Sequence, residues 1–206
     1  MQQILKRIFD LFLATILFIL STPVLTILII LIKFTSKGPA IFKQNRVGQN
    51  KVNFNILKFR TMRTDTPKNM PTHLLKEPAK YITPIGKILR KTSLDELPQL
   101  INIIKGEMSF VGPRPALFNQ IDLIELRDKY KVNSIKPGVT GWAQVNGRDE
   151  LDIPTKVEYD KYYYEHQSFL FDLKILIKTA LSVIFAKGVI EGNRNLKTEN
   201  IESQNV

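Results

Sequence analysis

The sequence predicts an α+β protein in which an apolar, membrane-embedded N-terminal helix precedes one small mixed domain. Residues 11–32 carry no charge and are mostly apolar, whereas residues 38–62 alternate apolar and polar side chains as strands do. Later segments space their apolar residues as amphipathic helices do, and 206 residues suffice for one domain with a hydrophobic core. The expected divisions are a membrane helix over 1–37, a domain over 38–188, and a polar, disordered tail over 189–206.

Composition narrows the possible chemistry. The chain has no cysteine, which excludes disulfides, thiolate metal sites and cysteine nucleophiles, and its two histidines do not suffice for a zinc site. Thirty basic residues against nineteen acidic ones give a net charge of +11, which favours anionic partners. Nucleic acid, anionic lipid and phosphorylated substrates all remain compatible with this charge.

The apolar N-terminal segment contains a predicted break. As a straight helix its 22 uncharged residues would be ~33 Å long, enough to span a bilayer. Pro23, at the midpoint, removes a backbone hydrogen bond and clashes with the preceding turn, so we expect a sharp bend there. The hydroxyl groups of Ser21 and Thr22 can satisfy the carbonyls that the bend frees.

The charges around this segment favour a re-entrant helix. Basic residues flank both of its ends, and the positive-inside rule is best met when both ends are cytoplasmic. A full span is the main alternative. A secretory signal is disfavoured, because the apolar run is too long and no A-x-A cleavage pattern follows.

Two strand-like stretches follow. Apolar residues alternate over 52–56 and again, in the opposite phase, over 57–61, which predicts two short strand halves separated by a bulge. Lys58 and Arg60 then share a face. A basic pair on a strand is either a solvated edge or the lining of an anion site.

The segment from 90 to 115 concentrates the chemistry of the chain. Two adjacent carboxylates, Asp95 and Glu96, precede an apolar helical pattern that ends at Gly106. Ser93 and Glu96 fit a capping box, while the proline at position 98 favours Asp95 itself as N-cap. In either register Asp95 lies at the positive end of a helix, where we expect it to be ionised and available as a nucleophile or cation ligand.

A purely structural role for these carboxylates is the alternative, because acidic residues are favoured at helix starts. The neighbouring arginines argue against it. Arg90 precedes the pair, and Arg114 is enclosed between Pro113 and Pro115. Capping needs no such arginine, whereas a phosphate is well bound by the rigid fork of a guanidinium group.

The remaining elements are predicted from local patterns. Thr83-Pro84 opens a short helix, residues 118–130 form an amphipathic helix, and residues 137–142 form a turn that feeds a short strand with a tight reversal at Asn146-Gly147. Residues 169–186 are apolar but interrupted by charges, so we expect them to lie in the membrane interface. A buried C-terminal helix is the alternative for this last segment.

Three motifs together resemble the bacterial sugar transferase family, the monotopic polyprenyl-phosphate phosphoglycosyl transferases that begin surface-glycan assembly. They are R-x-T-S-L-D-E-L-P-Q-L-x-N from Arg90, G-x-M-S-x-V-G-P-R-P from Gly106, and K-P-G-V-T-G-W-A-Q-V-N-G-R from Lys136. The K-F-R-T-M element at Lys58 is similar to another family motif. The likeness extends over about residues 6–187.

The resemblance implies a fold and a location. The fold is a re-entrant N-terminal membrane helix, broken at Ser21, Thr22 and Pro23, plus a small cytoplasmic α/β catalytic domain with interfacial amphipathic helices. The location is the cytoplasmic face of the inner membrane. Larger members of the family carry an extra N-terminal multi-span region, so this chain resembles the minimal catalytic form.

The resemblance also implies an activity: transfer of a sugar 1-phosphate from a UDP-sugar to undecaprenyl phosphate, with release of UMP, through a covalent intermediate on Asp95. It implies Mg²⁺ bound by Asp95, with Glu96 as either metal orienter or general base. The minimal form resembles enzymes that use UDP-N-acetylated amino sugars, including UDP-diacetylbacillosamine. The implied substrate-binding residues are Lys58, Arg60, Arg90, Arg114, Gln144, Asn146 and Arg148.

Two other functions remain as alternatives. A non-catalytic membrane module that binds anionic lipid or a partner protein would explain the charge and the apolar helices, although not the carboxylates facing a proline-enclosed arginine. Nucleic-acid binding is disfavoured, because no recognition motif is visible and the basic residues are spread along the chain. The residues select neither one sugar, one glycan pathway nor an oligomeric state.

Overall fold

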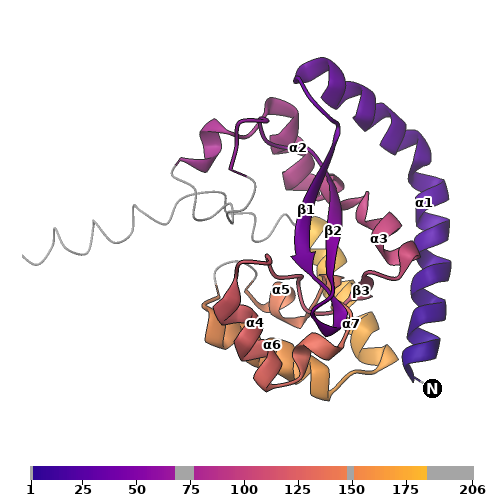
Figure 1. The fold of residues 1–206 in the computed structure, drawn as a ribbon. Helices are drawn as coiled ribbons and strands as arrows, with labels where there is room; N and C mark the ends of the chain where they lie inside the picture. Colours follow the sequence, from indigo (N-terminus) through magenta and orange to yellow (C-terminus); the bar gives the residue numbers. More distant parts are fainter. Residues whose placement is uncertain (1, 68–76, 148–150, 185–206) are drawn as a thin grey trace, which may run out of the picture.

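A long N-terminal helix lies along one side of a helix-rich domain that contains a β-hairpin (Figure 1). The computed structural model describes residues 2–67, 77–147 and 151–184. The helices and strands are, in chain order, α1 (Gln2–Thr35), β1 (Ile41–Val47), β2 (Asn53–Phe59), α2 (Pro84–Thr92), α3 (Gln99–Lys105), β3 (Ser109–Val111), α4 (Ile121–Lys129), β4 (Gly138–Thr140), α5 (Trp142–Asn146), α6 (Ile153–Glu165) and α7 (Phe169–Ile184). The predicted mixture of helices and strands is confirmed.

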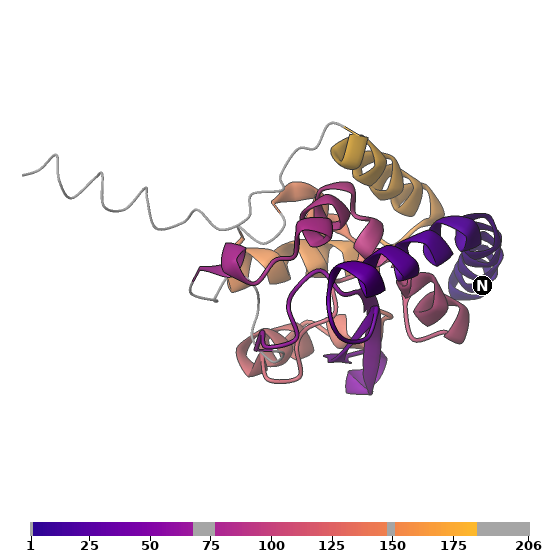
Figure 2. The ribbon, with the colours of Figure 1, turned by 90° about the horizontal axis from the view of Figure 1, so that it is seen from above.

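Helix α1 bends but is not interrupted. It has 34 residues with Pro23 inside it, and Figures 1 and 2 show it changing direction along its length. The hydroxyl groups of Ser21 and Thr22 both donate to the carbonyl of Phe18, at 3.2 and 2.9 Å. Pro23 removes the helical donor of the next carbonyl, that of Ile19. The hydroxyls therefore reinforce the turn before the proline, instead of satisfying the carbonyl that it frees as predicted.

Both ends of α1 pack against the same domain. Asp10 and Ala14 are buried near its start, and Leu28 and Ile32 are buried near its end. By length and composition the helix could cross a membrane. Between these two contacts Phe18 and Leu25 still pack against the domain, while the other large apolar side chains are exposed, namely those of Ile16, Leu17, Ile19, Leu20, Val24 and Ile27.

The hairpin of β1 and β2 is continuous. Its antiparallel register runs without an extra residue from Ile41 opposite Phe59 to Val47 opposite Asn53, so the predicted bulge is wrong. The change of phase in the sequence has another cause. Phe54 belongs to one hydrophobic cluster and Phe59 to a second, so the strand turns different faces to the core along its length.

The short parallel pair of β3 and β4 brings two distant loops together. A Cβ atom on Gly138 would lie 2.1 Å from the backbone nitrogen of Gly112, and one on Gly141 would lie 2.2 Å from the Gly112 carbonyl oxygen. Only glycine permits backbones to approach so closely. The predicted strand after Trp142 is wrong, because β4 precedes it and α5 begins there, so that Asn146-Gly147 ends a helix.

The remaining helices lie largely where the local sequence patterns predict them. Thr83 caps α2 as predicted, its hydroxyl accepting a hydrogen bond from the Gly86 N–H at 3.0 Å. Helix α4 lies within the predicted range 118–130. The predicted tail over 189–206 lies outside the described residues.

Helix α7 is amphipathic in a way that its charges alone did not indicate. Asp172 points into the domain, where its carboxylate accepts hydrogen bonds from Lys6 Nζ at 2.5 Å and from the Tyr163 hydroxyl at 2.7 Å. The opposite face exposes large apolar side chains, those of Phe169, Leu170, Leu173, Ile177 and Leu181.

Candidate active site

The adjacent carboxylates lie in a 3-10 turn, Leu94–Glu96, between α2 and α3. The predicted capping box is wrong. Ser93 ends α2 in the left-handed conformation, with φ of 57°, and makes no side-chain capping bond. Asp95 is not the N-cap of α3 either, because Pro98 occupies that position. The helix C-terminus is as predicted, with Gly106 at φ of 85°.

Glu96 is bound to two cationic side chains. Its Oε1 lies 2.6 Å from Lys58 Nζ and 3.5 Å from Arg114 Nη2. Burial alone would raise the pKa of Glu96, but the charges of Lys58 and Arg114 outweigh it and lower the pKa to about 2. Glu96 is therefore ionised near neutral pH, and a carboxylate with so low a pKa is a weak base.

Asp95 has a different environment from its neighbour. Within the described part of the chain its carboxylate accepts no hydrogen bond. Burial raises its pKa to about 6, and the charge of Glu96 adds to this, while Lys58, Arg90 and Arg114 oppose it. The predicted position at the positive end of α3 is wrong, because α3 begins only at Gln99, and burial rather than a helix terminus dominates the pKa of Asp95. A carboxyl group with a pKa of about 6 is nevertheless mostly ionised near neutral pH.

Three of the predicted basic residues surround the carboxylates. Lys58 and Arg114 contact Glu96 directly. Arg90 donates from Nε to the Thr61 hydroxyl at 2.9 Å, and its charge acts on Asp95. The side chain of Arg114 is 39% exposed, so part of it faces solvent beside the carboxylates.

The other predicted substrate-binding residues are placed differently. Arg60 is buried and does not join Lys58, because its Nη2 donates to the Ser36 carbonyl and hydroxyl at 2.8 and 2.7 Å, at the end of α1. Both polar atoms of the Gln144 amide are buried and have no hydrogen-bond partner among the described residues. Asn146 Nδ2 donates to the Trp142 carbonyl within α5. Arg148 lies outside the described residues.

The carboxylates of this site suit a metal ion that is bound jointly by protein and substrate, rather than one whose ligands all come from the protein. Among the residues that the structure describes, no three His, Asp or Glu side chains lie together as metal ligands. Mg²⁺ commonly uses one or two carboxylates and completes its shell with water and substrate phosphates. Asp95 offers such a carboxylate, whereas both cations beside Glu96 compete for its oxygens.

Sequence reasoning missed the residues that support this site. Asn102 joins α3 to β2, accepting from the Leu57 N–H at 3.0 Å and donating to the Asn55 carbonyl at 2.9 Å. Arg127 and Asp160 form a buried ion pair behind Arg114. Asn102 belongs to a quoted motif, but Arg127 and Asp160 lie in separate helices and no spacing rule connects them.

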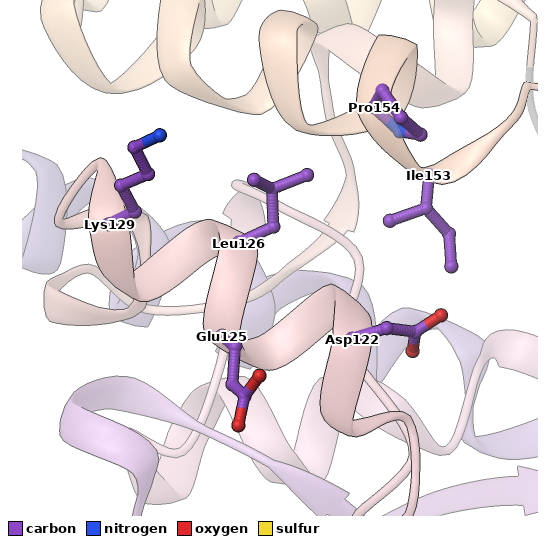
Figure 3. Close-up of a pocket in the computed structure, with 6 residues that line it drawn as sticks. All are labelled: Asp122, Glu125, Leu126, Lys129, Ile153 and Pro154. Carbon is purple, nitrogen blue, oxygen red and sulfur yellow. The ribbon is translucent and has the colours of Figure 1, made fainter.

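An open groove of about 660 Å³ lies elsewhere, between α4 and α6 (Figure 3). None of its lining residues belongs to the predicted site. They are Asp122, Glu125, Leu126, Lys129, Ile153 and Pro154.

Comparison with known proteins agrees with the motifs. The family described as bacterial sugar transferase matches residues 1–186. The chain is 39% identical to the uncharacterized sugar transferase EpsL of Bacillus subtilis, over 93% of each chain. It is 40% identical to the UDP-glucose:undecaprenyl-phosphate glucose-1-phosphate transferase of Escherichia coli, over 86% of this chain and 40% of that protein.

A third relative is named for another sugar. It is the UDP-N-acetylgalactosamine-undecaprenyl-phosphate N-acetylgalactosaminephosphotransferase of Aeromonas hydrophila, 34% identical over 89% of this chain and 44% of that protein. The chain thus spans less than half of the two relatives with named substrates, and nearly all of the Bacillus protein. As its motifs predicted, the chain belongs to the bacterial sugar transferase family of enzymes.

Proposed function

We propose that this enzyme transfers a sugar 1-phosphate from a UDP-sugar to undecaprenyl phosphate and releases UMP. The observation that carries the proposal is the pair Asp95 and Glu96, of which Glu96 forms ion pairs with Lys58 and Arg114, whereas Asp95 accepts no hydrogen bond from the described residues. The relatives named for undecaprenyl-phosphate sugar transfer support the substrates. The reaction is the first membrane step of surface-glycan or glycoprotein-glycan assembly.

Asp95 is the proposed nucleophile. Its ionised Oδ attacks the β-phosphorus of the UDP-sugar, a new O–P bond forms, and the bond from this phosphorus to the bridging oxygen breaks so that UMP leaves. The product on the enzyme is a glycosyl-phosphoryl-aspartate. A phosphate oxygen of undecaprenyl phosphate then attacks the same phosphorus and releases the Asp95 carboxylate. A half-buried carboxylate with no hydrogen bond from the described residues is suited to this role, because no protein donor has to be displaced before it attacks.

The surrounding cations stabilise the charge that develops on the phosphoryl oxygens. Arg114 and Arg90 offer guanidinium forks, and Lys58 offers a point charge. Glu96 holds Lys58 and Arg114 in place, and its low pKa favours this orienting role over that of a general base. Mg²⁺ held by Asp95 and the donor diphosphate would further neutralise the phosphates.

A re-entrant α1 is the proposed topology. A helix of 34 residues is about 51 Å long, and a straight span would place its two ends on opposite sides of the bilayer. The buried residues near both ends, Asp10 and Ile32, contact one domain. This favours a helix that enters and leaves on the cytoplasmic side, with its exposed apolar middle in the lipid and the exposed face of α7 at the interface.

For the donor we propose the class of UDP-N-acetylated amino sugars. The Aeromonas relative is named for such a sugar, whereas the E. coli relative is named for glucose. The test assays purified protein with undecaprenyl phosphate, Mg²⁺ and a panel of UDP-glucose, UDP-N-acetylglucosamine, UDP-N-acetylgalactosamine and UDP-diacetylbacillosamine. UMP release with an amino-sugar donor is expected, and release with UDP-glucose alone would contradict the donor class.

The same assay separates the enzyme from the alternative of a non-catalytic lipid-binding module. Such a module would bind anionic vesicles and release no UMP from any donor in the panel. Asp95→Asn serves as the blank, because an amide cannot replace the nucleophile.

A further inference from the structure

The segment from Pro113 to Ala116 is held by its backbone to three different elements, β1, α4 and β4. The two prolines restrict their own φ angles and those of the residues before them. In addition, four consecutive carbonyl oxygens each accept a hydrogen bond. The pairs are Pro113 O with Gly138 N at 2.9 Å, Arg114 O with Arg127 Nη1 at 2.9 Å, Pro115 O with Arg46 Nη1 at 3.0 Å, and Ala116 O with Val47 N at 2.9 Å.

The bond to the Arg114 carbonyl comes from a buried ion pair. Arg127 in α4 donates from Nε and Nη2 to Asp160 Oδ2 in α6, at 2.9 and 2.6 Å. The two side chains are only 5% and 1% exposed, and Figure 1 shows α4 and α6 side by side. All three nitrogen atoms of the Arg127 guanidinium therefore have a fixed partner, and one of these partners is the backbone of Arg114.

A buried ion pair is weak evidence for stability, because removing two charges from water costs about as much as their attraction returns. The hydrogen bond from Arg127 to the Arg114 carbonyl oxygen says more about the role of the pair. Asp160 fixes the plane of the Arg127 guanidinium, and this plane in turn fixes the peptide group of Arg114. The side chain of Arg114 leaves that backbone toward Glu96. A displacement of the Arg114 backbone by a fraction of an ångström would move its guanidinium group relative to a bound phosphate.

We propose that Arg127 and Asp160 are positioning residues, which touch no substrate and hold the backbone of Arg114 so that its guanidinium meets the donor phosphate. The inference rests on the proposed phosphate-binding role of Arg114. Lysine at position 127 would keep the charge beside Asp160, but it lacks the fork that reaches the carboxylate and the Arg114 carbonyl together.

The test is a double-mutant cycle on UMP release, measured as kcat/KM for the donor with the highest turnover in the panel above. Arg127→Lys should lower kcat/KM about tenfold, the loss expected for one positioning hydrogen bond. In the Arg114→Lys background, Arg127→Lys should lower kcat/KM by less than about twofold, because the Arg114 guanidinium that Arg127 positions is already absent. A full tenfold loss in both backgrounds would overturn the inference and leave the proposed function intact.

A second variant covers a failure of Arg127→Lys to fold. Replacing both partners, as Arg127→Met with Asp160→Leu, keeps the volume and removes both charges, a change that buried ion pairs often tolerate. It should fold, associate with membranes, and show the same loss with the same dependence on Arg114. Wild-type kcat/KM in this folded double variant would overturn the inference.

The matched control is Asp128→Asn, which breaks the exposed Lys51–Asp128 ion pair on the same helix without contacting Arg114. This variant should retain wild-type kcat/KM. A tenfold loss in Asp128→Asn would mean that any change in α4 impairs turnover, and it would overturn the specific role of Arg127. If Arg114→Lys itself has wild-type activity, both this inference and the proposed phosphate contact are wrong.

Discussion

Lys58 Nζ lies 2.6 Å from Glu96 Oε1 and joins the end of β2 to the turn before α3. The two side chains are only 17% and 21% exposed, so water screens the pair weakly. Glu96 is thereby committed to holding cations, while the adjacent Asp95 has its pKa raised by burial. Neighbouring carboxylates whose pKa values are driven apart are suited to different tasks.

Asp95→Asn should abolish UMP release and leave folding and membrane association unchanged, because an amide is a far poorer nucleophile. The measurement combines UMP release with detection of a sugar-phosphate adduct on the wild-type protein by mass spectrometry. Kinetics should be ping-pong. An adduct on another residue, or a sequential mechanism with direct attack by the lipid phosphate, would contradict the assignment.

Wild-type activity should depend on the ionisation of Asp95. Its pKa is about 6, so kcat/KM should fall about tenfold for each pH unit well below that value, where the carboxyl group is protonated. In Glu96→Gln the negative charge that raises this pKa is lost, and the freed charge of Lys58 also favours the ionised form. The midpoint of the residual activity should therefore move to lower pH.

The pH experiment compares profiles of UMP release for wild type and Glu96→Gln over the same buffers. Asp128→Asn is the control, since that carboxylate is exposed and pairs with Lys51 rather than with the site. A midpoint that stays in place in Glu96→Gln would show that the titrating group is not Asp95.

Arg114→Lys should lower kcat/KM by roughly 30- to 160-fold, which corresponds to about 2–3 kcal/mol in transition-state stabilisation. Lysine retains the charge but loses the bidentate fork. The rates are measured as UMP release at low donor concentration. A lysine variant as active as wild type would indicate that Arg114 serves the fold through its contact with Glu96.

Features set by neighbouring residues were predictable from the sequence. Thr83 before a proline marked the start of α2, and Gly106 after an apolar pattern marked the end of α3. Local reasoning failed where a distant partner decided the outcome. Ser93 and Glu96 have the spacing of a capping box, but Glu96 binds Lys58, which is 38 residues away.

The residues that support the site could not be predicted from the sequence for the same reason. Arg127 and Asp160 read as polar positions on two helices, and only the packing of α4 on α6 buries them against each other. Arg60 matched a family motif beside Lys58, yet the end of α1 captures its guanidinium. Motifs identified the family and drew attention to the adjacent carboxylates Asp95 and Glu96, whereas tertiary packing determined which basic residues lie beside them.

The topology of α1 can be tested at Pro23. Pro23→Ala restores the missing N–H and removes the ring clash, which is worth roughly 3 kcal/mol toward a straight helix. The uncharged segment is then long enough to span. The N-terminal half, however, is anchored to the domain by Lys6, which pairs with Asp172, and by Asp10, which accepts from the Phe110 N–H. We therefore expect a mixed population in which only part of the N-termini lie outside.

The measurement uses Gln3→Cys, since the chain has no other cysteine, and a membrane-impermeant thiol reagent on intact spheroplasts. With Pro23 present, Cys labelling should require a breached membrane, because both ends of α1 contact a domain that the proposed reaction places in the cytoplasm. Pro23→Ala should label in part, and adding Lys6→Met with Asp10→Leu should increase the labelled fraction, because the Lys6–Asp172 ion pair and the hydrogen bond from the Phe110 N–H to Asp10 are then removed. Complete labelling from outside with Pro23 present would show that α1 spans the bilayer, and it would require the packing of Asp10 and Ala14 against the domain to be abandoned in the membrane.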